Sequence, residues 1–141
     1  MNVFLPPPGI YHIQVGFLSG KKMRYQGSLV EDENSDDLIK TEDPSRKGLF
    51  RLSHNEDGTI SLFSLTLNKY VCLNPRSYSS EVGFYVGGEI AKFELRQLEI
   101  PSDGAVQLLV ASKFLSGGYS NLYLWNEEKH AKLFKFLPVK S

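Results

Sequence analysis

An aromatic and amide-rich segment near the C-terminal end holds the residues best suited to binding a ligand. Alternation along 122–125 places Tyr123 and Trp125 on the face opposite Leu122 and Leu124, so one pair packs inward and the other faces outward. An aromatic ring beside amides suits a sugar, because the apolar face of a pyranose lies on the ring while polar groups bond its hydroxyls. In the alternative arrangement, Trp125 fills the interior of the domain.

The candidate sugar-binding set combines this segment with a second loop of similar composition, which begins at Asn74. Its members share an aromatic ring, an amide or a guanidinium. They are Arg76, Tyr78, Tyr119, Asn121, Tyr123, Trp125 and Asn126. This set predicts a glycan or glycoprotein as the partner, and it requires no cofactor.

The acidic segment 31–37 matches a calcium-binding loop only in part. Asp32, Asn34 and Asp36 have the spacing of the first three oxygen ligands. However, Asp37 stands where such a loop needs glycine for its bend, and the twelfth position is an aspartate instead of a bidentate glutamate. We therefore predict a solvated acidic loop and no metal site.

No catalytic site is predicted from the remaining reactive residues. The histidines His12, His54 and His130 share no metal-binding spacing. Cys72, beside Val71 in an alternating strand, is expected to be a small buried hydrophobe and not a nucleophile. The sequence has no serine-hydrolase elbow, phosphate-binding loop or His-Glu-x-x-His motif. We therefore predict that the protein is not an enzyme.

The composition indicates where the protein is located and which classes of partner it does not bind. The 16 lysine and arginine residues balance 16 aspartate and glutamate residues, so no global field attracts nucleic acid or an anionic membrane, and we expect neither as a partner. A single cysteine excludes an intrachain disulfide. Residues 1–8 lack a basic start and contain three consecutive prolines, so we expect no signal peptide or membrane span and predict a cytoplasmic protein.

The elements that position these residues are predicted to be strands. Most apolar segments are short and alternate with polar positions, as in 60–65 and 93–98. No run of ten residues has convincing helical periodicity, and residues 126–132 allow at most one or two turns. The chain is therefore predicted to be all-β.

The same order of elements occurs three times, at intervals of roughly 40 to 50 residues. Each unit contains a glycine-led strand, a lysine followed by apolar residues, a weaker third strand and a closing phenylalanine. These features fall at Gly9, Gly58 and Gly104; at Lys22, Lys69 and Lys113; around 38–40, 82–86 and 122–125; and at Phe50, Phe93 and Phe134.

Units this small cannot cover their own apolar faces, so we expect them to pack around a pseudo-threefold axis. The prediction is a β-trefoil of twelve strands, forming a single domain over 1–141, with an extended lead-in over 1–8 and repeats at about 9–55, 56–101 and 102–139. The predicted core consists of Ile10, Ile13, Met23, Phe50, Leu52, Ile60, Leu62, Tyr70, Val71, Phe93, Leu95, Val106, Leu108, Phe114, Leu115, Leu124, Phe134 and Phe136.

This order of elements resembles that of the fascin-like and cytokine-like β-trefoils. Two segments are more similar to the amaranthin-like plant lectins: 21–26 reads K-K-M-R-Y-Q where that family reads K-Y-L-R-Y-Q, and the run from Asp57 to Val71 resembles its second unit. The resemblance covers roughly the first two units and involves scaffold residues. It implies a lectin that could form a homodimer. It does not extend to galactose-type specificity or to a sugar site between subunits, because this chain has a single tryptophan.

Two functions therefore compete. The first is a carbohydrate-binding lectin of β-trefoil type. The alternative is a protein-binding trefoil, which would be an actin-binding module, a protease inhibitor that presents one loop, or a cytokine-like ligand. The exposure of Trp125 separates them, because a fully buried indole would favour the second.

Overall fold

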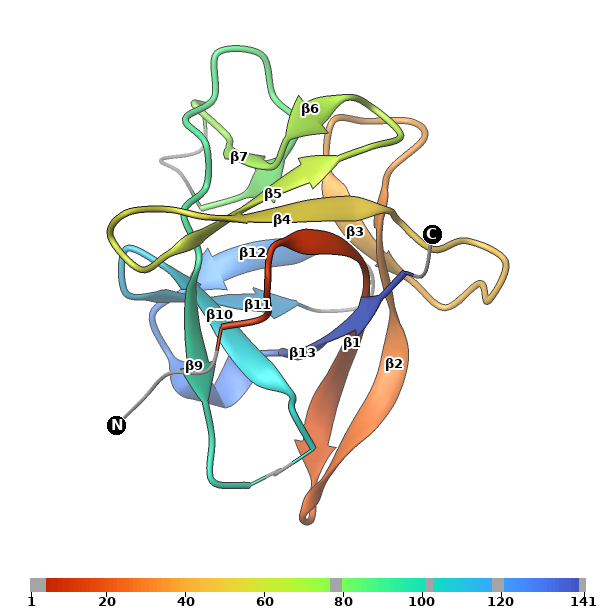
Figure 1. Cartoon of the computed structure of the whole chain (residues 1–141), viewed down its shortest axis with the longest axis vertical. Helices are drawn as coiled ribbons and strands as arrows, with labels where there is room; N and C mark the ends of the chain where they lie inside the picture. The colour runs from red at the N-terminus through yellow and green to blue at the C-terminus, as the bar shows by residue number, and fades with distance from the viewer. Residues whose placement is uncertain (1–4, 77–79, 101–102, 118–120, 140–141) are drawn as a thin grey trace.

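The computed structural model describes residues 5–76, 80–100, 103–117 and 121–139. Apart from one short 3₁₀ helix, every element in these residues is a strand, which confirms the all-β prediction (Figure 1). The elements are β1 (Gly9–Ser19), β2 (Lys22–Glu31), β3 (Leu38–Thr41), β4 (Phe50–His54), β5 (Ile60–Ser64), β6 (Lys69–Tyr70), β7 (Cys72–Leu73), β8 (Val82–Gly83), β9 (Glu94–Gln97), β10 (Val106–Val110), β11 (Lys113–Gly117), β12 (Leu122–Trp125), η1 (Glu128–His130) and β13 (Leu133–Pro138). Within the described residues, no helix has the length and apolar character needed to cross a bilayer.

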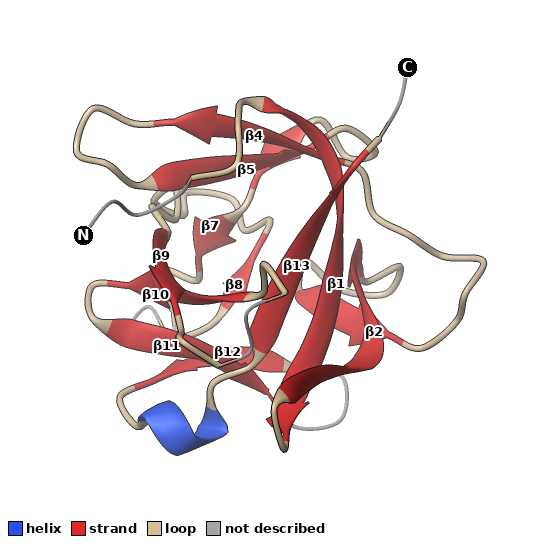
Figure 2. Cartoon of the chain, turned by 60° about the horizontal axis from the view of Figure 1, so that its bottom comes forward, coloured by secondary structure: helices blue, strands red, loops and turns tan. Residues whose placement is uncertain are grey.

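The larger sheet is antiparallel and strongly curled (Figure 2). β1 pairs with both β4 and β13, and β4 pairs with β5. Ile60 of β5 then bridges Phe93, directly before β9, and β9 pairs with β10. A further pairing of Val106 with Phe134 joins β10 to β13. Followed from strand to strand, the pairings return to β1.

Three hairpins lie outside this series of pairings, formed by β2 with β3, β7 with β8, and β11 with β12. Each hairpin contacts the other two through an isolated bridge. These bridges join Asp37 to Gly83, Ile39 to Asn121, and Glu81 to Tyr123. The contacts bring β12, which carries Trp125, against segments from both other hairpins.

One backbone hydrogen bond recurs in equivalent places. Two residues before each closing phenylalanine, an N–H donates to a carbonyl in, or directly before, the first strand of the preceding hairpin. The pairs are Gly48 to Leu29 (3.1 Å), Ala91 to Val71 (3.0 Å) and Lys132 to Leu115 (3.1 Å). Leu29, Val71 and Leu115 therefore occupy corresponding positions.

This correspondence corrects the sequence alignment of the first unit. Lys69 and Lys113 stand two residues before Val71 and Leu115, but the residue two before Leu29 is Gly27 and not Lys22. The β1–β2 hairpin is longer than an alignment on lysines assumes, so Lys22 lies further out along it.

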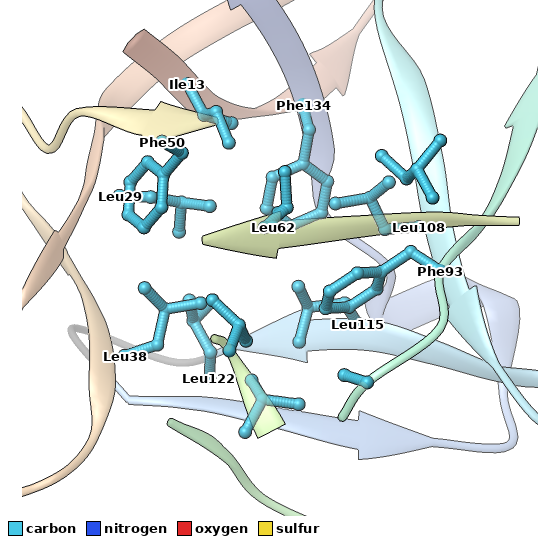
Figure 3. Close-up of a cluster of buried hydrophobic side chains, with 14 of the residues drawn as sticks. Ile13, Leu29, Leu38, Phe50, Leu62, Phe93, Leu108, Leu115, Leu122 and Phe134 are labelled. Atoms are coloured by element: carbon cyan, nitrogen blue, oxygen red, sulfur yellow. The ribbon is translucent and has the colours of Figure 1, made fainter. Parts of the chain in front are cut away.

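The buried apolar side chains of the described residues form a core cluster in which Phe50, Phe93 and Phe134 are fully buried (Figure 3). Most of the predicted core residues belong to it, but Ile10 and Tyr70 are exposed. The strand period explains both errors: Ile10 alternates with the buried Tyr11, and Tyr70 alternates with the buried Val71.

Two further predicted core residues are only partly buried. Met23 lies near the outer end of the β1–β2 hairpin, beyond the stretch of β1 that pairs with β13. Phe136 packs edge-on against Tyr11 at the margin of the core, with ring centroids 5.8 Å apart. Both residues lie where the strands leave the central cluster.

Candidate functional site

The side chains of β12 alternate as the sequence predicts. Leu122 and Leu124 are buried, whereas Tyr123 and Trp125 point to the other side of the strand. Trp125 is 45% exposed, so the alternative in which its indole fills the interior is wrong. An exposed indole contributes little to the core and is available to a ligand.

Trp125 lies in an open groove of about 560 Å³, whose lining includes Ser80, Lys113, Tyr123, Asn126 and Glu127. The ring of Tyr123 meets the indole edge-on, with centroids 6.1 Å apart and planes at 88°. An amide, an ammonium group and a carboxylate thus flank the aromatic surface. Glu127 Oε2 also pairs with Lys129 Nζ at 3.2 Å, which leaves lone pairs on the carboxylate for further donors.

The loop from the second unit forms one wall of the groove. The N–H of Leu124 donates to the Ser80 carbonyl at 2.6 Å, and Glu81 bridges Tyr123. The N–H of Asn74 in turn donates to the Glu81 carbonyl at 2.9 Å. The segment that follows the loop beginning at Asn74 therefore meets β12 through Ser80 and Glu81.

A second set of contacts supports the groove from β11. Phe114 lies opposite Trp125 in the β11–β12 pairing, so the two side chains share a face. The Arg96 guanidinium lies 5.9 Å from the Phe114 ring centroid and donates to Glu128 Oε2 at 3.1 Å. Gln107 Nε2 donates to the same carboxylate at 3.5 Å. Glu128 begins η1, so these contacts hold the chain directly after the groove.

The structure brings together three of the predicted site residues, Tyr123, Trp125 and Asn126. Sequence reasoning missed Ser80, which reaches the groove through the hydrogen bond from Leu124, and Lys113, which stands at the start of β11, the strand that pairs with β12. Glu127 was missed although it directly follows Asn126 in the chain.

The other predicted site residues are not brought into this groove. Asn121 lies at the opposite end of β12, in a separate hollow beside Asp37 and Glu81. Arg76 is exposed in the neighbouring loop, where its N–H donates to Asn74 Oδ1 at 2.9 Å. Tyr78 and Tyr119 lie outside the described residues.

The acidic loop is closed by its own hydrogen bonds. Asp32 accepts bonds from the N–H of Asn34 (2.9 Å) and the hydroxyl of Ser35 (2.9 Å). These two bonds, the first being the larger cause, lower the pKa of Asp32. The hydroxyl of Tyr85 donates to Asp37, and burial followed by this bond raises the pKa of Tyr85. Across the residues that the structure describes, no three metal-ligating side chains come together.

Cys72 and two of the histidines are engaged in structural contacts. The Cys72 thiol accepts from the N–H of Tyr85 (3.1 Å) and donates to its carbonyl (3.3 Å), while burial raises the pKa of the thiol. His12 Nδ1 donates to the Gly48 carbonyl at 2.8 Å. His54 Nε2 donates to the carbonyl of Pro6 at 2.7 Å. A protonated, buried thiol is a poor nucleophile.

Comparisons of the chain with protein-family models and with curated proteins found no match. The function is therefore inferred from the geometry of the Trp125 groove.

Proposed function

We propose that this chain is a β-trefoil lectin whose sugar site is the Trp125 groove. Three observations support the trefoil arrangement: the three fully buried closing phenylalanines, the three mutually bridged hairpins, and the hydrogen bond that recurs before each closing phenylalanine. Together they are what three similar units packed around one axis would produce.

The exposure of Trp125 is the observation that carries the sugar-binding role. A pyranose has one face made of C–H groups, and this face lies flat on an indole while its hydroxyls point to the rim. Asn126 would donate to and accept from these hydroxyls, Glu127 would accept from them, and Lys113 would donate to them. Tyr123, edge-on to the indole, fixes the orientation of that surface.

The open shape of the groove sets the expected strength of binding. A site that covers one face of a sugar makes few contacts, so we expect about 4 kcal/mol and a Kd of about 1 mM for a simple sugar. Display of several sugars on one surface raises the apparent affinity without any new contact. Detection therefore requires multivalent ligands.

A glycan array tests the proposal with three proteins. The unmodified chain is expected to bind at least one family among galactose, N-acetylgalactosamine and mannose ligands, and Trp125→Ala is expected to abolish that binding. Tyr70→Ala is the matched control, because Tyr70 is also an exposed aromatic but lies away from the groove. Silence of the unmodified chain across the array would contradict the proposal, as would full binding by Trp125→Ala.

The protein-binding alternative predicts a different set of results. An actin co-sedimentation assay and a protease panel test for the actin-binding module and the inhibitor. The groups beside the indole favour the sugar-binding function, since the amide of Asn126, the carboxylate of Glu127 and the ammonium of Lys113 offer the hydrogen bonds that sugar hydroxyls need.

A further inference from the structure

The β1–β2 hairpin extends past the rest of the sheet (Figure 1). β1 pairs with β13 only as far as Gly16, and β2 pairs with β3 only from Ser28 onward. Residues 17–25, here called the hairpin tip, therefore form a two-stranded ribbon, and no third strand among the described residues pairs with either of its edges. In the view of Figure 1, the hairpin tip projects at the bottom of the molecule.

The hairpin tip carries apolar side chains that the core does not use. Phe17 is 41% exposed, Leu18 is 45% exposed and Tyr25 is 53% exposed. Leu18 lies opposite Met23, and Tyr25 lies on the same side of the ribbon opposite Gly16. A free two-stranded ribbon gains little stability from such side chains, and exposed apolar groups gathered at one projecting end indicate an interaction site.

The charges of the hairpin tip are all positive. Lys21, Lys22 and Arg24 are exposed, and the sequence has no acidic residue from position 5 to position 30. At the base of the ribbon, Lys132 Nζ lies 5.9 Å from the Phe17 ring centroid and donates to Gln26 Oε1 at 2.7 Å. No ion pair within the described part of the chain involves a cation of the hairpin tip.

The zero net charge of the chain hides this segregation. Because salt screens charges beyond about 8 Å at physiological ionic strength, a surface in contact with the hairpin tip experiences the local cations and not the sum over the chain. The expectation that neutrality excludes an anionic membrane therefore does not apply to a projecting ribbon.

We propose that the hairpin tip docks on an anionic lipid surface. Leu18 and Tyr25, which share one face of the ribbon, insert among the headgroups, while the long side chains of Lys21, Lys22 and Arg24 reach lipid phosphates and carboxylates. This is the combination of apolar area and positive charge that interfacial binding needs. The exposed Leu18 favours lipid over nucleic acid, because a hydrocarbon side chain gains free energy in the acyl region of a bilayer and gains little against a phosphate backbone. The proposal concerns a different end of the molecule from the Trp125 groove and does not depend on it.

Co-sedimentation of the full chain with vesicles tests the proposal. The chain is expected to sediment with vesicles of phosphatidylcholine mixed with phosphatidylserine, and to remain in the supernatant with vesicles of phosphatidylcholine alone. Each cation near such a surface contributes about fivefold to binding, so Lys22→Glu, which reverses a charge, is expected to weaken binding about 20- to 30-fold. Leu18→Ser is expected to weaken binding through lost insertion.

Two matched controls have the same substitutions at exposed positions elsewhere. Lys92→Glu changes net charge as Lys22→Glu does, and Val86→Ser removes an exposed apolar group as Leu18→Ser does. Both controls are expected to bind as the unmodified chain does. Equal losses in tip and control variants would overturn the proposal. So would failure of the unmodified chain to sediment, or binding of single-stranded RNA in place of vesicles.

The result of the lipid experiment does not depend on the result of the sugar experiment. The tip variants leave the Trp125 groove intact, so their unchanged signal on the glycan array also shows that they are folded. If the array is silent, urea unfolding midpoints close to that of the unmodified chain serve the same purpose.

Discussion

Truncation of Phe93 is the sharpest test of the packing. Its side chain is fully buried, and its backbone exchanges two hydrogen bonds of 2.8 Å with Ile60, so Phe93→Ala removes the ring without removing the pairing. Loss of a fully buried phenyl ring costs about 3–5 kcal/mol, from the lost transfer free energy together with the cavity that remains. The expected loss is a large part of the total stability of a domain this size.

Urea unfolding monitored by circular dichroism measures this cost. With a slope of about 2 kcal/mol per molar urea, a loss of about 4 kcal/mol moves the midpoint down by about 2 M. Phe17→Ala is the matched control, because its ring lies on the hairpin tip outside the core and contacts Lys132, so its loss is expected to cost no more than about 1 kcal/mol. An unchanged midpoint for Phe93→Ala would refute the packing described above.

The other two closing phenylalanines extend this test to the repeat. Phe50 and Phe134 are also fully buried, so each alanine variant is expected to lose about 3–5 kcal/mol as well. If one of the three truncations were neutral, the three units would not contribute equivalently to one core.

Three further predictions concern acid stability, thiol reactivity and packing. The hydrogen bond from the Thr59 hydroxyl is the chief cause that lowers the pKa of Asp57 in the folded protein. The ionised carboxylate therefore stabilises the fold above about pH 4, and this stabilisation is lost as the pH falls through the lowered pKa. In urea melts at a series of pH values, Asp57→Ala should show a smaller loss of stability on the acid side. Cys72, being buried with a raised pKa, should react slowly with Ellman's reagent in the folded protein and rapidly in urea. Gly83→Ala would place a methyl group against the Asp36 carbonyl and should cost about 1–3 kcal/mol, whereas Gly9→Ala, whose nearest neighbour would be 3.7 Å away, should be nearly neutral in the same melts.

The strand period made much of the architecture predictable. Alternation identified β5 and β12, and the closing phenylalanines were placed in the core because each one closes one of the three units. The same rule, applied strictly, would also have excluded Ile10 and Tyr70 from the core, since each has an inward-facing neighbour one position along.

Strand length was harder to predict than strand type. A lysine-led match placed Lys22 in register with Lys69, whereas the hydrogen bond from Gly48 to Leu29 shows that the first hairpin runs longer. How far a hairpin projects depends on where the strands that pair with its two edges end, and those strands are far away in the sequence.

The site was predictable only where it is local. Tyr123, Trp125 and Asn126 are close in sequence and came from alternation along one strand. Ser80 enters the groove through a hydrogen bond from Leu124, which no local pattern indicates. Tertiary pairing between units, which decides which loops meet, leaves no periodic signal in a single sequence.

Titration of the tryptophan fluorescence tests the proposed sugar site most directly, because Trp125 is the only tryptophan and its emission therefore reports on the groove alone. Without ligand, the emission should have the red-shifted maximum of a water-exposed indole and be readily quenched by acrylamide. Addition of an array-positive sugar should shift the maximum to shorter wavelength and protect the indole from the quencher. Unchanged emission and quenching at saturating concentrations of that sugar would contradict the assignment of the groove as the binding site.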